Sequence, residues 1–132
     1  MRENECYHLR GETDIATAVM GSYIYARSCG LAQQQISEVA TTVSELATNV
    51  IKYAFSGEVW IEHLFQSGRE GIKLTIIDRG PGIADLQSAL QEHFSTGQSL
   101  GLGLPGVQRL MDEFAVETST EGTRVTVIKW RS

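Results

Sequence analysis

The 132-residue sequence has a formal net charge of −5, with 42% hydrophobic and 20% charged residues, which is the balance of an ordinary globular domain. The length suits a single domain spanning residues 1–132, and the acidic balance argues against a nucleic-acid-binding surface, which is normally basic. No apolar run is long enough to cross a bilayer and no signal peptide is recognised, so we expect a cytoplasmic protein without a membrane partner.

Hydrophobic spacing predicts a strand and two helices in the amino-terminal part of the chain. Residues 5–11 are expected to form a short edge strand. Thr13 or Asp14 can cap a helix that ends at Gly30. A second helix is predicted over residues 32–54, because apolar residues recur there at steps of three and four. These apolar residues are Ile36, Val39, Val43, Leu46, Ala47, Val50 and Ala54.

A β-hairpin is predicted next. Residues 58–66 alternate in hydrophobicity, and residues 72–77 form the returning strand after a turn with the sequence SGREG. The second of these strands stops at Asp78, and the following RGPGI is typical of a loop. A short helix is then expected over residues 84–92.

The carboxyl-terminal part predicts a mobile segment, a helix and a second hairpin. Residues 94–103 are rich in glycine, serine and threonine, and residues 104–114 are expected to be helical. Residues 115–119 and 123–130 form the hairpin around TEG. The order of elements predicts an α+β fold, a two-layer α/β sandwich with about three helices on one face of a mixed, mostly antiparallel sheet.

The cysteines and histidines give no indication of disulfide or metal chemistry. Cys6 and Cys29 show no metal-ligand spacing, and although they could pair, reduced and buried thiols are the simpler interpretation. His8, His63 and His93 lie in or beside predicted elements, where we expect surface or packing roles.

Two motifs are each weak indications of a ligand site. Glu45 and Asn49 lie one helical turn apart, so they could hold Mg²⁺ beside phosphates, or Glu45 could accept a proton from a hydroxyl. A solvated helix face is the alternative. Asp78 ends an apolar strand and could accept a hydrogen bond from the exocyclic amine of a base. Gly80 and Gly82 would let a flat ring approach the backbone, although a tight turn explains them equally well.

A third motif is the segment FSTGQSLGLGLPG at residues 94–106, which leads into a predicted helix. Its backbone N–H groups could bind phosphate oxygens, and its glycines would allow it to close over a ligand. A flexible surface loop would have the same composition. No lysine follows the glycines as in a Walker A loop, so a P-loop fold is disfavoured.

Taken in this order, the three motifs resemble those of the GHKL (Bergerat-fold) ATPases over nearly the whole chain. The resemblance implies that Asn49 holds Mg²⁺, that Asp78 binds the adenine amine of ATP, and that the glycine segment forms a lid over the phosphates. It also implies that Thr123 lies near the adenine. The nucleotide-binding residues implied in this way are Asn49, Asp78, Gly80, Gly82, Thr96, Gly101, Leu102, Gly103, Leu104 and Thr123.

Within this superfamily, the segments ELATNVIKYA and FSTGQSLGLGLPGVQRLMDEF are most similar to the stressosome switch kinases, a subgroup of the bacterial partner-switching serine/threonine kinases. The resemblance implies that Glu45 is the catalytic residue, and that the acceptor is a STAS-domain protein of a stressosome. It further implies release of the kinase to activate an effector such as a phosphatase. The alternative is an anti-sigma factor kinase that sequesters a sigma factor. Tyr53 stands where many anti-sigma kinases have a histidine, which fits the switch kinases.

Overall fold

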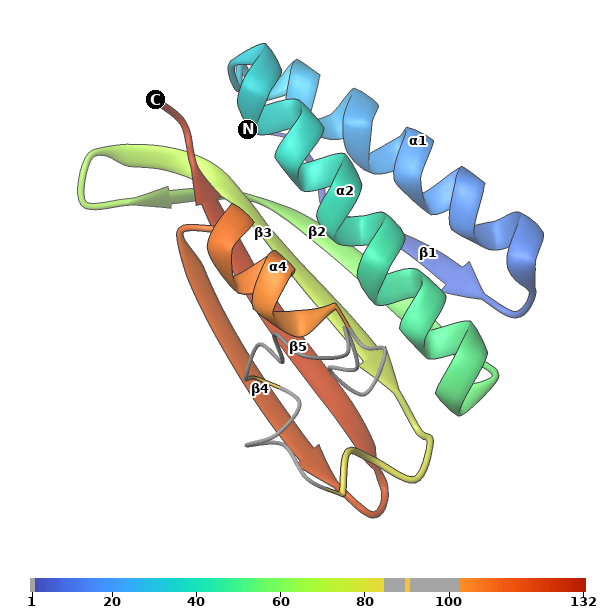
Figure 1. Cartoon of the computed structure of the whole chain (residues 1–132). Helices are drawn as coiled ribbons and strands as arrows, with labels where there is room; N and C mark the ends of the chain where they lie inside the picture. The colour runs from blue at the N-terminus through green and yellow to red at the C-terminus, as the bar shows by residue number, and fades with distance from the viewer. Residues whose placement is uncertain (1, 85–89, 91–102) are drawn as a thin grey trace.

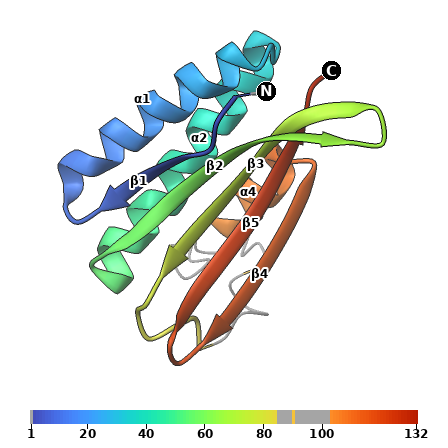
Figure 2. The same cartoon turned by 180° about the vertical axis from the view of Figure 1, so that it is seen from behind.

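The fold was obtained as a computed structural model, which describes residues 2–84, 90 and 103–132. In this part of the chain, a five-stranded sheet carries the helices α1, α2 and α4 on one face, while its other face has no helix against it (Figures 1 and 2). The predicted two-layer α/β sandwich is therefore confirmed. Every neighbouring pair of strands is antiparallel, so the described sheet is not mixed.

The amino-terminal half supplies an edge strand and the long helices. Strand β1 spans Glu5–Leu9, helix α1 spans Glu12–Ser28 and helix α2 spans Gln33–Asn49. A π-helical turn, η1, covers Val50–Ala54. None of the helices in the described residues has the length and apolar character needed to span a bilayer.

The remaining strands form two hairpins, as predicted, with a short helix between them. Strands β2 (Gly57–Gln66) and β3 (Arg69–Asp78) make the first hairpin, and β4 (Glu113–Ser119) and β5 (Gly122–Trp130) make the second. Helix α4 spans Leu104–Leu110. The strand order is β1-β2-β3-β5-β4, so the last strand pairs with β3 in the middle of the sheet. The carboxyl end of β3 and the start of β5 therefore lie side by side.

The start of α1 differs from the prediction. The N-cap is Gly11, and neither Thr13 nor Asp14 occupies that position. Instead, the Asp14 carboxylate accepts hydrogen bonds from the backbone N–H groups of Arg10 (2.8 Å) and Gly11 (3.1 Å). A carboxylate inside the first turn satisfies donors that the helix leaves unpaired, so it stabilises the start without being the cap itself.

Two predicted helices also end differently. The segment expected to form one helix over residues 32–54 forms α2 up to Asn49 and the π-helical turn beyond it. Apolar spacing continues through both parts, so it does not reveal the boundary between them. The helix expected over residues 104–114 ends at Leu110. Beyond it the chain joins the sheet, since the N–H of Asp112 donates to the carbonyl of Ile128 (3.0 Å). Apart from its first residue and Leu90, the helix expected over residues 84–92 lies outside the described residues, as does nearly all of the segment 94–103.

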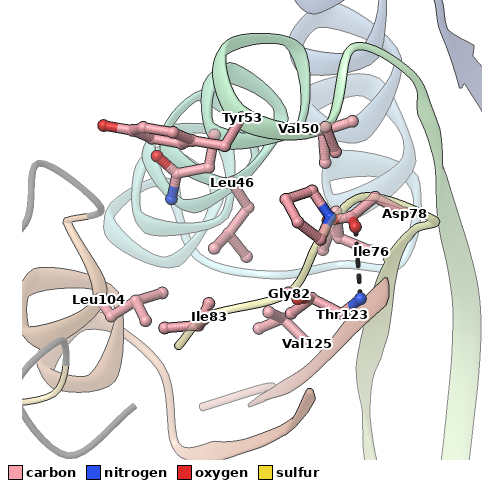
Figure 3. Close-up of a pocket in the computed structure, with 13 residues that line it drawn as sticks. Leu46, Val50, Tyr53, Ile76, Asp78, Gly82, Ile83, Leu104, Thr123 and Val125 are labelled. Atoms are coloured by element: carbon pink, nitrogen blue, oxygen red, sulfur yellow. Dashed lines mark hydrogen bonds between the residues drawn. The ribbon is translucent and has the colours of Figure 1, made fainter. Parts of the chain in front are cut away.

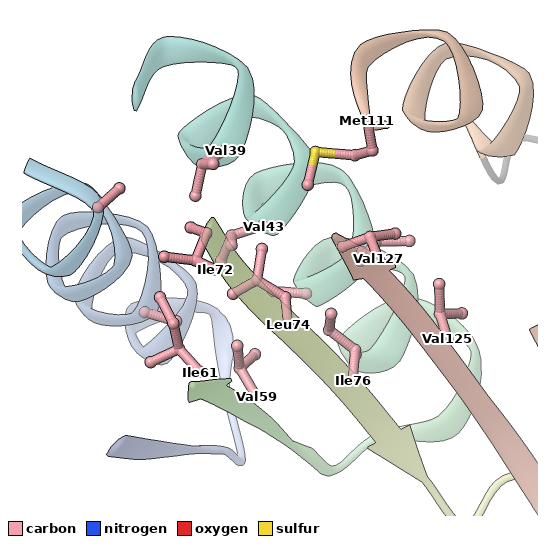
Figure 4. Close-up of a cluster of buried hydrophobic side chains, with 14 of the residues drawn as sticks. Val39, Val43, Val59, Ile61, Ile72, Leu74, Ile76, Met111, Val125 and Val127 are labelled. Carbon is pink, nitrogen blue, oxygen red and sulfur yellow. The ribbon is translucent and has the colours of Figure 1, made fainter. Parts of the chain in front are cut away.

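The core lies between α2 and the helix-facing side of the sheet (Figure 4). Alternate residues of β3 form its centre: Ile72, Leu74 and Ile76 are buried, while the residues between them face the opposite side. The other labelled members of the cluster are Val39, Val43, Val59, Ile61, Met111, Val125 and Val127. This packing holds the carboxyl-terminal end of α2 against the end of β3 and the start of β5.

A buried ion pair joins β5 to α2. The Lys129 side chain is 7% exposed, and its Nζ lies 2.8 Å from Glu38 Oε1 and donates to the carbonyl of Leu110. Replacing Lys129 with alanine would leave the Glu38 carboxylate and that carbonyl without this cation. We expect the free energy of unfolding to fall by about 2–3 kcal/mol, somewhat less than for a fully buried pair because Glu38 retains some solvent contact.

Urea denaturation of the single variants Lys129→Ala and Glu38→Ala and of the double variant measures this effect. The double variant should be less destabilised than the sum of the two single variants, because no unpaired charge remains. Lys73→Ala, on the helix-free face of the sheet, is the control and should change stability by less than about 0.5 kcal/mol. Equal effects of Lys73→Ala and Lys129→Ala would contradict the prediction.

Candidate functional site

A pocket opens between the carboxyl-terminal end of α2 and the end of the sheet at which β3 finishes and β5 begins (Figure 3). Its empty volume is about 470 Å³, a figure that includes space open to solvent. Most of its wall is apolar, with a few polar groups. The lining residues are Leu46, Asn49, Val50, Tyr53, Ala54, Ile76, Asp78, Pro81, Gly82, Ile83, Leu104, Thr123 and Val125.

The helix wall of the pocket comes from α2 and the π-helical turn. Leu46, Asn49 and Tyr53 follow one another at steps of three and four, so their side chains share one side of the helix. Leu46 and Val50 are buried, whereas Asn49 is half-buried and brings an amide to the pocket. The helix therefore presents an apolar surface with one polar group on it.

Asp78 provides the carboxylate of the pocket. Its Oδ1 accepts hydrogen bonds from the backbone N–H groups of Gly80 (2.9 Å) and Thr123 (3.3 Å), the second of which is drawn in Figure 3. These bonds fix the orientation of the carboxylate at the end of β3. Among the described residues Oδ2 makes no hydrogen bond, so it remains available to a donor on a ligand.

Thr123 lies directly opposite Asp78 in the register between β3 and β5. Its hydroxyl oxygen is 2.9 Å from that of Thr118 on β4. The Thr118 hydroxyl oxygen also accepts a hydrogen bond from the backbone N–H of Ile83 (2.8 Å). This network attaches the loop after β3 to the last hairpin. Thr118 was not predicted from the sequence, although its place in the alternating pattern of β4 indicates that it faces the helix side.

The two glycines after Asp78 are required by the packing of the chain itself. A Cβ on Gly80 would lie 2.5 Å from the Cβ of Ala54. Gly82 has a φ of +81°, and a Cβ there would collide with the carbonyl of Ser119. Gly82 therefore needs glycine for the backbone conformation of the turn, whereas Gly80 needs it for the close approach to Ala54. Of the two, only Gly82 also lines the pocket.

Glu45 does not line the pocket but lies beside its rim. Its side chain is exposed and its Oε2 lies against Gly103, where a Cβ would come within 2.5 Å of that oxygen. Gly103 has a φ of +65° and precedes α4, whose first residue, Leu104, is buried and lines the pocket. The predicted site residues Thr96, Gly101 and Leu102 lie outside the described residues.

The fold thus brings together residues that are far apart in the sequence. Of the predicted nucleotide-binding residues, Asn49, Asp78, Gly82, Leu104 and Thr123 line one pocket. The apolar wall formed by Leu46, Val50, Ala54, Ile76, Ile83 and Val125 was not predicted as part of the site, because these residues have the same spacing as core residues. Figure 3 shows Asp78 and Thr123 at one end of the pocket and Leu104 and Tyr53 toward the other.

This arrangement suits a flat heterocycle that carries an amine. The apolar walls would cover the two faces of the ring, and Asp78 Oδ2 could accept a hydrogen bond from the amine. The amide oxygen of Asn49 is a hard ligand of the kind that Mg²⁺ accepts beside phosphates. The donor set is therefore compatible with ATP and Mg²⁺.

Comparison with known proteins places the chain among kinases and related ATPase domains. Residues 11–129 match the model of the histidine kinase-like ATPase domain. The chain is 38% identical over 131 residues to the serine/threonine-protein kinase RsbT of Bacillus subtilis (strain 168), covering 98% of each protein. It is 35% identical over 103 residues to the anti-sigma F factor of Thermoanaerobacter sp. (strain X514), covering 74% of this chain and 71% of that one.

Solved structures share the fold at low sequence identity. The structure of the RsbU and RsbW domains of Rv1364c from Mycobacterium tuberculosis aligns with a TM-score of 0.69 at 14% identity, over 99% of this chain and 34% of that one. The histidine kinase domain of the blue-light activated histidine kinase from Erythrobacter litoralis EL346 aligns with a TM-score of 0.55 at 21% identity, over 89% and 63% of the two chains. These two likenesses support the fold.

Proposed function

Because this chain belongs to the histidine kinase-like ATPase family and is an ATP-dependent serine/threonine-protein kinase, we propose that it phosphorylates a STAS-domain scaffold protein of a stressosome. After phosphorylation the kinase leaves the scaffold and activates a downstream effector, such as a phosphatase, in the cytoplasm. The observation that carries this proposal is the 38% identity to RsbT, which extends over 98% of both chains.

The pocket supports the nucleotide part of the proposal. At one end the Asp78 carboxylate accepts a hydrogen bond from the adenine amine, and the apolar residues of α2 and β5 cover the ring. Asn49 would hold Mg²⁺ beside the phosphates, where the ion would neutralise part of their charge. Gly103 and the predicted residues Thr96, Gly101 and Leu102 belong to the segment proposed to cover the phosphates.

Glu45 is the proposed catalytic residue. It is exposed on α2 one turn before Asn49, so the acceptor hydroxyl of another protein can reach it. In the proposed step the hydroxyl oxygen forms a bond to the γ-phosphorus while the bond to the β–γ bridging oxygen breaks, and ADP leaves. The hydroxyl proton passes to the Glu45 carboxylate.

The second candidate function is an anti-sigma factor kinase that sequesters a sigma factor, and the similarity to the anti-sigma F factor of Thermoanaerobacter favours it. That similarity covers 74% of this chain, whereas the similarity to RsbT covers 98%. The extent of the match therefore favours the switch kinase.

Phosphoryl transfer to candidate acceptors tests the proposal. The purified chain is incubated with γ-labelled ATP, Mg²⁺ and each STAS-domain protein of the source organism. We expect label on a serine or threonine of one STAS protein, and loss of affinity between the two proteins once that residue is phosphorylated. Labelling of no STAS protein, combined with tight binding of a sigma factor in a parallel pull-down, would contradict the switch-kinase proposal and favour the alternative.

A further inference from the structure

The helix-free face of the sheet carries a cluster of three potential metal ligands: Cys6 and His8 on β1, and Glu58 on β2. The thiol sulfur, an imidazole nitrogen and a carboxylate oxygen all lie within 4.8 Å of one another. We propose that these residues bind a divalent transition-metal ion of the Zn²⁺ class. This site is separate from the nucleotide pocket, which lies on the helix-facing side of the sheet.

Strand pairing sets the positions of the three ligands. Cys6 and His8 are two residues apart on β1, so their side chains point to the same face of the sheet. Glu58 lies directly opposite His8 in the register between β1 and β2. Tyr7, between the two β1 ligands, packs toward Gly21 of α1, which places Cys6 and His8 on the other face. The ligands therefore come from two paired strands, which hold their Cα positions more firmly than a loop would.

The Glu58 carboxylate is already oriented toward the other ligands. Its Oε1 accepts a hydrogen bond from the indole Nε1–H of Trp60 (3.1 Å), and its Oε2 lies 3.6 Å from His8 Nδ1. One oxygen is thus held by a neighbouring residue while the other faces the cluster. Such supporting hydrogen bonds are a regular feature of carboxylates that bind metal ions.

The chemistry of the cluster favours Zn²⁺ over Mg²⁺. A thiolate, an imidazole and a carboxylate are the three ligand types of zinc sites, whereas Mg²⁺ requires oxygen ligands. With metal–ligand distances of about 2.0–2.3 Å, two ligand atoms of a tetrahedral site lie roughly 3.5 Å apart. His8 Nδ1 and Glu58 Oε2 are already 3.6 Å apart. The separations from the Cys6 sulfur, which are within 4.8 Å, need to shorten by no more than roughly 1 Å. His8 can supply this movement, because its side chain is 57% exposed. Three protein ligands leave a fourth position for water.

A simple surface ion pair is the competing explanation, and it accounts for less of the cluster. The separation of His8 and Glu58 fits a solvent-exposed pair, which contributes little to stability. It gives no role to the Cys6 thiol. Burial and the neighbouring Glu58 carboxylate raise the pKa of Cys6, so a bound metal has to displace a thiol proton. We therefore expect weaker binding than in a closed, cysteine-rich zinc site.

Titration of the nucleotide-free, reduced protein with Co²⁺ and Zn²⁺ tests the site. Co²⁺ should produce a thiolate-to-cobalt charge-transfer band in the near ultraviolet, and Zn²⁺ should abolish it. The band should be absent in Cys6→Ser, and Zn²⁺ affinity should fall at least about tenfold in His8→Ala and in Glu58→Gln. Cys29→Ala removes the other cysteine, which is buried in the core, and should leave the band unchanged.

Each outcome decides for or against the proposal. Because His8 is exposed, His8→Ala should keep the fold even if Cys6→Ser does not. Co²⁺ binding without a charge-transfer band, or with a band that persists in Cys6→Ser, would overturn the proposal. Unchanged Zn²⁺ affinity in both His8→Ala and Glu58→Gln would also overturn it. Phosphoryl transfer is not part of the readout, so failure here is distinct from failure of the proposed kinase function.

Discussion

Replacing Asp78 with asparagine should lower ATP affinity by at least about 100-fold while the fold remains intact. Asparagine can keep its amide oxygen at the Oδ1 position, so the N–H groups of Gly80 and Thr123 retain their acceptor. At the Oδ2 position, however, it presents an amide donor to the adenine amine. Two donors would then face each other in a partly buried pocket, so the loss of binding free energy would exceed the contribution of the hydrogen bond alone. Isothermal titration with ATP measures the change.

Nucleotide preference gives a sharper form of the same test. Guanine carries a carbonyl where adenine carries its amine. The wild-type Asp78 carboxylate should therefore repel GTP, whereas the amide N–H of Asp78→Asn should donate a hydrogen bond to the guanine carbonyl. The ratio of ATP to GTP affinity should therefore narrow or reverse in the variant. Circular dichroism and thermal unfolding confirm that the fold is retained. ATP affinity within about threefold of wild type would show that Asp78 does not bind the adenine amine.

Replacing Glu45 with alanine should reduce the rate of phosphoryl transfer by about 10²–10⁴-fold with little change in ATP affinity. The carboxylate lies at the rim, outside the residues that line the pocket, so nucleotide binding does not depend on it. Its proposed task is to accept the proton of the acceptor hydroxyl. Single-turnover labelling of the acceptor protein, together with titration of ATP, separates the two effects.

Two further variants separate chemistry from contact with the acceptor. Glu45→Gln keeps the size and hydrogen-bonding capacity of the side chain but cannot take up a proton, so it should be nearly as slow as Glu45→Ala. Glu62→Gln removes a carboxylate from the helix-free face of the sheet and should transfer phosphate at the wild-type rate. Undiminished transfer by Glu45→Gln would remove Glu45 from the catalytic role.

The order of strands explains how one small domain assembles the pocket. Because β5 inserts between β3 and β4, the carboxyl end of β3 meets the start of β5, and Asp78 lies opposite Thr123. The same arrangement brings Thr118 of β4 close enough to bond Thr123. The polar end of the pocket therefore depends on pairing between strands that are separated by more than forty residues.

Much of the architecture could be predicted from local patterns. Alternation in β2, followed by a turn and the apolar run of β3, predicted the first hairpin, and apolar steps of three and four along α2 predicted the helix that covers the core. The motif containing Asp78 and the pair formed by Glu45 and Asn49 were visible as well, because Asp78 ends an apolar strand and Glu45 and Asn49 lie one helical turn apart. Local patterns were less reliable at element ends, as the prediction past Leu110 shows.

Tertiary structure alone decided which of these residues meet. Spacing within a strand or helix determines the face on which a side chain lies, and that information is local. The register between distant strands is decided by packing of the whole sheet. Sequence spacing therefore could not predict that Glu58 lies beside Cys6 and His8. For the same reason, Leu46 and Val125 were recognisable as apolar residues but not as walls of a pocket. The sequence determined the chemistry available, and the pairing of strands determined where that chemistry is concentrated.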